Sequence, residues 1–178
     1  MNKNLVGLLV VGMLSQLATG ILGPVYALLY QKIGDFSTTS ISFGIFSLTL
    51  AILETPLGHL SDKYGRKKFI ILGGILASIV SISYTFINSP MQLYALEVLA
   101  GAATAMQTPV LYSMLSETFP KNKKGKFFGL FDSSINMTYG LASIVAGLLF
   151  SIFGLEFLFI LSSTIHAFSA AVAYKLKC

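Results

Sequence analysis

Charged residues are scarce in this chain of 178 residues, at 11%, whereas soluble domains average about 25%. So few charges cannot cover the surface of a water-soluble fold. The single cysteine, Cys178, rules out an intrachain disulfide. The two histidines, His59 and His166, are isolated in the sequence, so no cluster of metal ligands is visible, and we expect neither a metal nor another cofactor.

Apolar residues are abundant instead, at 54% of the chain. They form six stretches, each near the length of about 20 residues that a helix needs to span a bilayer. The stretches take up nearly the whole chain, which predicts an all-α membrane protein with one domain over residues 1–178. The expected transmembrane helices cover about residues 5–30, 40–60, 69–87, 91–117, 127–153 and 155–174. We expect a polar turn at 31–39, and loops at 61–68 and at 119–126.

The basic residues gather on one side of this predicted topology. Of the 12 lysines and arginines, only Lys32 lies on the other side. The rest are Lys3, Lys63, Arg66, Lys67, Lys68, Lys121, Lys123, Lys124, Lys126, Lys175 and Lys177. Because cytoplasmic loops are enriched in Lys and Arg, both termini are predicted in the cytoplasm, with the protein in the cell membrane. These clusters explain the net charge of +5 as contacts with the bilayer, so we expect no nucleic-acid partner.

The segment after the second apolar stretch carries a recognisable motif. Residues 58–68 read GHLSDKYGRKK, which resembles the pattern G-x-L-x-D-(R/K)-x-G-(R/K)-(R/K)-(R/K) of the major facilitator superfamily, at the expected cytoplasmic end of the second helix. Gly23-Pro24, 101–103 (Gly-Ala-Ala) and 124–126 (Lys-Gly-Lys) also resemble the family. The resemblance covers essentially the whole chain, as the family's N-terminal half. It implies a six-helix half bundle built as a 3+3 inverted repeat.

In the family this motif acts as a latch, meaning that it holds the two halves of the transporter together in one conformation. The residues that the resemblance assigns to the latch are Gly58, Asp62, Gly65, Arg66, Lys67 and Glu117. Glycine permits close helix approach or a tight turn, and an arginine can bind a carboxylate through two nitrogens. We expect Arg66 to pair with Glu117. The alternative is a basic anchoring loop with Glu117 merely solvated.

Three carboxylates lie within predicted membrane helices, where ionisable residues are costly and are functional candidates by default. They are Glu54, Glu97 and Asp132. Glu97 stands four residues before Gly101, where many proton-coupled members of the family have an arginine, so the charge is reversed. Proton coupling through Glu97 or Glu54 is a further hypothesis.

Polar residues also share helical faces. On the fourth predicted helix they are Glu97, Thr104, Thr108 and Tyr112; on the first, Ser15, Thr19, Tyr26 and Tyr30, with Gln16 beside this face; on the fifth, Asp132, Asn136, Tyr139 and Ser143. In the family, helices 1 and 4 line the central cavity, helices 2 and 5 form the interface between halves, and we expect the apolar helices 3 and 6 to face lipid. The alternative for each polar face is hydrogen bonding between helices of the bundle.

These features predict a half-size secondary transporter that moves a small solute by alternating access, as a dimer of two copies. One alternative is a fragment or subunit of a twelve-helix transporter, paired with another six-helix half. Another is a non-transporting structural or regulatory membrane protein. An enzyme is not expected, since the chain has no G-x-S-x-G or H-E-x-x-H motif. The predicted cavity has an acid and no base, which favours neutral or cationic solutes. Residues 139–147 lack the G-P-x-x-G-G element of drug antiporters.

Overall fold

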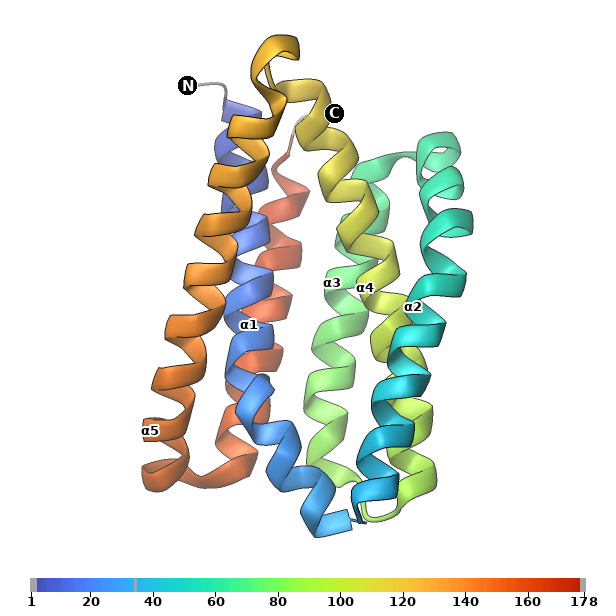
Figure 1. Cartoon of the computed structure of the whole chain (residues 1–178), viewed down its shortest axis with the longest axis vertical. Helices are drawn as coiled ribbons and strands as arrows, with labels where there is room; N and C mark the ends of the chain where they lie inside the picture. The colour runs from blue at the N-terminus through green and yellow to red at the C-terminus, as the bar shows by residue number, and fades with distance from the viewer. Residues whose placement is uncertain (1–2, 34, 177–178) are drawn as a thin grey trace.

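The computed structural model describes residues 3–33 and 35–176, apart from the side chains of residues 3 and 30–32. The expectations for Lys3, Tyr30, Lys32, Lys177 and Cys178 therefore lie outside the described side chains. The elements in chain order are α1 (Lys3–Ile33), α2 (Phe36–Tyr64), α3 (Arg66–Ser83), the 3-10 turn η1 (Tyr84–Phe86), α4 (Pro90–Thr118), the 3-10 turn η2 (Lys121–Lys123) and α5 (Lys124–Tyr174) (Figure 1). The described part of the chain is all-helical, and five of its helices are long and apolar enough to cross a membrane.

Helix α5 is broken at Gly154, as the sequence predicts. Its 51 residues would make a straight helix of about 77 Å, more than twice the ~30 Å core of a bilayer. Gly154 has φ 78° and ψ −176°, a conformation open essentially to glycine alone. The chain reverses there, so residues 124–153 (the first segment of α5) and 155–174 (the second segment) run in opposite directions beside α1 (Figure 1).

Helix α2 begins earlier than expected. The predicted polar turn at 31–39 is wrong, because α1 continues to Ile33 and α2 starts at Phe36. Asp35 caps α2, since its side chain accepts a hydrogen bond of 2.9 Å from the Thr38 N–H. Hydrogen bonds from Thr38 also lower the pKa of Asp35, which stabilises the charged cap.

The predicted loop at 61–68 is also wrong, because helix occupies almost all of it. Helix α2 runs to Tyr64, α3 starts at Arg66, and Gly65 alone separates them. Gly65 has φ 105°, and its N–H donates to the carbonyl of Ser61 at 2.9 Å. One glycine in a conformation closed to other residues thus replaces the expected loop.

Two further helix ends differ from the prediction. Helix α3 ends at Ser83 and not at residue 87 as expected, and η1 covers residues 84–86 of the remaining stretch. In the predicted loop at 119–126, η2 and the start of α5 at Lys124 supply helical structure. The start of α4 is as expected, with Pro90 in its first turn and Ser89 as its cap.

The helices pack in a fixed set of pairs. Helix α1 lies mainly against α5, α2 lies mainly against α4, and α3 contacts both α4 and α5. Small residues bring the backbones together: a Cβ on Gly20 of α1 would lie 2.6 Å from the Tyr139 carbonyl oxygen, and one on Gly101 of α4 would lie 2.8 Å from that of Phe46. Such close packing supplies the association energy of helices in lipid, where the hydrophobic effect between helices is absent.

Substituting Gly101 should destabilise the bundle, and Gly140 offers a matched control. The new methyl group of Gly101→Ala would press on the α2 backbone, and overpacking of this kind costs about 1–3 kcal/mol. Gly140 also lies within a helix but has open space around it, so Gly140→Ala should be neutral or stabilising. Thermal unfolding in detergent measures both. Equal stability of the two variants would contradict the close α2–α4 contact.

Candidate functional site

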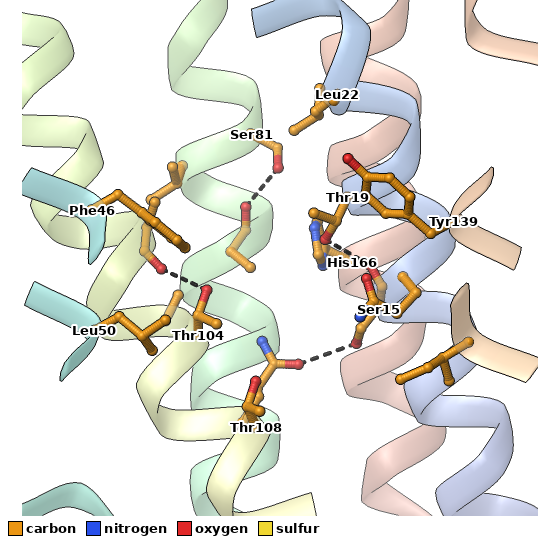
Figure 2. A pocket seen from close by; sticks show the side chains of 18 of the residues that line it. Ser15, Thr19, Leu22, Phe46, Leu50, Ser81, Thr104, Thr108, Tyr139 and His166 are labelled. Carbon is orange, nitrogen blue, oxygen red and sulfur yellow. Dashed lines mark hydrogen bonds between the residues drawn. The ribbon is translucent and has the colours of Figure 1, made fainter. Parts of the chain in front are cut away.

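A cavity of about 490 Å³ lies between α1 and α4. Helices α2, α3 and both segments of α5 complete its wall (Figure 2). The space exists because α1 is held against α5 while α4 is held against α2 and α3. The polar residues that line it are Ser15, Gln16, Thr19, Tyr26, Ser81, Glu97, Thr104, Gln107, Thr108, Tyr112, Tyr139 and His166.

The structure separates the candidate residues into two groups. Those of α1 and α4 line the cavity, namely Gln16, Thr19, Tyr26, Glu97, Thr104, Thr108 and Tyr112. Glu54 and Asp132 are not in its lining. Glu54 is half-buried on α2 and makes no hydrogen bond or ion pair with the described residues. Asp132 accepts a hydrogen bond from the hydroxyl of Tyr112, and Tyr112 in turn lines the cavity.

Glu97 is the only carboxylate among the residues that line the cavity, and only 4% of it is exposed. The hydroxyl of Tyr84 donates to Glu97 Oε1 at 3.0 Å. Tyr84 belongs to η1, is itself buried, and packs edge-on against Tyr26 with ring centroids 5.3 Å apart. Sequence reasoning missed Tyr84 as the partner of Glu97, because η1 lies in a segment that was expected to be apolar.

A hydrogen bond joins the two main walls of the cavity. The Ser15 hydroxyl donates to Gln107 Oε1 at 3.2 Å, which links α1 to α4. The same hydroxyl lies 3.2 Å from that of Ser169 on the second segment of α5. The bond from Ser15 to Gln107 spans the cavity, because both residues line it.

Helix α3 and the second segment of α5 expose large apolar side chains such as Ile79 and Phe168, as expected for helices that face lipid, and they also direct serines inward. Ser78 donates to the Ser163 carbonyl at 2.9 Å, and Ser162 donates to the Ala18 carbonyl of α1 at the same distance. The spacing of residues 162, 166 and 169 places them on one helical face. That spacing was the signal for His166 and Ser169, which the sequence analysis did not single out.

An ion cluster joins three helices at the end of the bundle where α2 meets α3. Arg66 Nε lies 2.8 Å from Asp62 Oδ1, and Arg66 Nη1 lies 2.7 Å from Glu117 Oε1, which confirms the expected pairing of Arg66 with Glu117. Because both acids are more than half exposed, the cluster adds little to the stability of the fold.

Lys67, which the resemblance also assigned to the latch, binds the end of α5 and the segment just after it, not an acid. Its Nζ donates to the Leu176 carbonyl at 2.8 Å and lies 5.0 Å from the centre of the Tyr174 ring. Gly58, also assigned to the latch, has open space at its Cβ position, since a Cβ there would meet no atom within 4 Å.

Replacing Tyr84 by phenylalanine should destabilise the protein by removing a hydroxyl that binds Glu97. A hydrogen bond to a charged group is worth about 1.5–3 kcal/mol. Tyr94 is the matched control, because it lies on α4 and makes no hydrogen bond with the described residues. Melting temperatures in detergent should fall for Tyr84→Phe and stay constant for Tyr94→Phe; an unchanged Tyr84→Phe would show that Glu97 does not depend on this bond.

The chain is similar to known proteins of one family. A family model described as the Major Facilitator Superfamily matches residues 8–177. An uncharacterised MFS-type transporter of Methanocaldococcus jannaschii, MJ1560, is 26% identical over 98% of this chain and 45% of its own length. A multi-drug resistance efflux pump PmrA homolog of Lactococcus lactis is 31% identical over 82% of this chain and 38% of its own.

A third relative differs in length. YitZ of Bacillus subtilis, an uncharacterised MFS-type transporter, is 24% identical over 89% of this chain and 97% of its own length. The chain therefore spans less than half of MJ1560 and of the PmrA homolog, but nearly all of YitZ. Since the family model covers all but the first seven residues and the last one, the protein belongs to the major facilitator superfamily and is a membrane protein.

Proposed function

We propose that this chain is one six-helix half of a secondary transporter, built as a 3+3 inverted repeat with both termini in the cytoplasm. The observation that carries the proposal is the polar cavity between α1 and α4. Polar groups are expensive inside a bilayer, and their grouping around a space large enough for an organic solute is typical of a transport path. A second half faces this cavity, and rocking of the two halves opens it to each side of the cell membrane in turn.

The solute is a small organic molecule that is neutral or cationic. Among the residues that line the cavity, Glu97 is the only charged one. Aromatic side chains of Phe43, Phe46 and Phe131 supply apolar contacts beside it. An aromatic cation fits both features, because rings attract cations and the carboxylate neutralises them.

The name of one relative agrees with such a solute, since the Lactococcus protein is called a multi-drug resistance efflux pump homolog. The G-P-x-x-G-G element of drug antiporters is nevertheless missing from residues 139–147. The solute class therefore rests on the lining of the cavity and not on that motif.

The second half is a second copy of the chain, related by a two-fold axis along the membrane normal. Gly58 on α2 and Gly125 and Gly129 on α5 all have open space around them, so another backbone can approach there. Asp62 would then meet the start of α5 in the other copy, twice by symmetry. The near-complete match to YitZ supports a transporter made from short chains. The other half of a longer protein is the competing partner.

Replacing Glu97 by glutamine should impair transport. We expect Glu97→Gln to lower the uptake of ethidium into proteoliposomes at least about tenfold, because a lost charge-assisted contact is worth about 1.5–3 kcal/mol. Proton coupling through Glu97 also predicts that the pH dependence of transport flattens. Glu156→Gln is the control, since Glu156 is exposed and outside the cavity. Unchanged rates and pH dependence for Glu97→Gln would remove Glu97 from the mechanism.

A further inference from the structure

His166 occupies a defined place in the wall of the cavity. It lies on the second segment of α5, only 6% of it is exposed, and its side chain is among those that line the cavity (Figure 2). Ser162 and Ser169, one turn before and after it, both bind the backbone of α1, at Ala18 (2.9 Å) and Val11 (3.2 Å). These two bonds hold this face of the helix against α1, so the imidazole is fixed between them.

The imidazole of His166 makes no hydrogen bond with any described residue, whereas the neighbouring serines on the same face all make one. Its Nδ1 is fully buried. A histidine ring carries two hydrogen-bonding nitrogens in every protonation state. A buried polar atom without a partner costs about 1–3 kcal/mol. Among the described residues that line the cavity, His166 Nδ1 is the buried side-chain atom of this kind.

A metal site does not account for the ring. The described residues contain no group of three His, Cys, Asp or Glu side chains that could hold a metal ion. The groups around His166 are instead hydroxyls and an amide, as Ser15 binds both Gln107 and Ser169 beside the cavity. This is the chemistry that recognises uncharged polar groups, which both donate and accept hydrogen bonds.

We propose that His166 is a specificity-determining residue, which binds an uncharged hydroxyl or amino group of the solute while Glu97 binds its positive charge. The inference rests on the proposed function, because it assigns a second contact within the same cavity. A solute with a polar group can bond the ring from the cavity, which His166 lines. A solute of similar charge and aromatic character without such a group leaves the ring unpaired, and sites of this kind discriminate strongly against the solute that lacks the group.

Two permanent aromatic cations separate these contacts. Ethidium carries two uncharged amino groups besides its charge, whereas tetraphenylphosphonium carries no hydrogen-bonding group at all. In binding measurements on the full chain in lipid nanodiscs, the affinity for ethidium should therefore depend on His166, and the affinity for tetraphenylphosphonium should not. We expect His166→Leu to weaken ethidium binding about tenfold, as for the loss of one hydrogen bond, and to change tetraphenylphosphonium binding less than about twofold.

Two further variants control the measurement. His166→Gln keeps a donor and an acceptor and should recover most of the ethidium affinity. His59→Leu removes the only other histidine, which is exposed and outside the cavity. It should leave the binding of both dyes unchanged.

A chemical measurement needs no substitution of His166, so a misfolded variant cannot affect its result. In His59→Leu, ethidium should slow the reaction of His166 with diethyl pyrocarbonate, while tetraphenylphosphonium at equal occupancy should slow it much less.

The outcomes separate the inference from the proposed function. Equal losses for both dyes in His166→Leu, an unchanged affinity for ethidium, or equal protection of the ring by both dyes would each overturn the role of His166 and leave transport of aromatic cations standing. Failure of the unmodified chain to bind either dye would overturn the proposed solute class, and the inference would fall with it.

Discussion

The constraint that shapes this molecule is that polar groups inside a bilayer find no water, so the protein itself must supply their partners. Most polar side chains of the helices meet it locally. Ser42, Thr104 and Thr138, for example, donate to the carbonyl four residues earlier in their own helix. Others meet it across helices, as Ser162 does at α1. The polar side chains that line the space between α1 and α4 include both kinds, and among them His166 keeps a buried nitrogen without a partner in the described part of the chain.

The packing of the helices follows from the same constraint. Backbones approach closely where glycines allow it, at Gly20 between α1 and α5 and at Gly101 between α4 and α2. These contacts hold α1 and α4 in separate groups of helices, which leaves a cavity that few residues bridge. Ser15 of α1 donates a hydrogen bond of 3.2 Å to Gln107 of α4 across this cavity. The ion cluster at Arg66 lies at one end of the bundle and ties α2, α3 and α4 together there.

The sequence was sufficient for features that depend on local composition. Apolar runs located the helices, Gly154 marked the reversal in α5, and the polar faces of α1 and α4 identified much of the cavity lining. Helix ends were predicted less well, because one capping residue decides them: Asp35 started α2 early, and Gly65 reduced a loop to one residue.

Contacts between distant segments could not be predicted from one sequence. Tyr84 meets Glu97 only because η1 turns the end of α3 toward α4, and no spacing in the chain encodes this. The sequence showed His166 only as an isolated histidine. Its place in the cavity wall depends on how its helix packs against α1. The pairing of Arg66 with Glu117 was found because a motif and a position at a helix end pointed to the same place.

The claim on which the account depends is that a second copy of the chain completes the cavity. Disulfide cross-linking tests it most directly, with Gly58→Cys and Gly129→Cys combined in a Cys178→Ser background. Both glycines face open space within one chain. Gly44→Cys with Gly129→Cys is the control, because Gly44 also faces open space but lies near the other end of α2. The account predicts rapid formation of a covalent dimer for the first pair and none for the control. Exclusively monomeric or intrachain products for the first pair would contradict assembly from two copies.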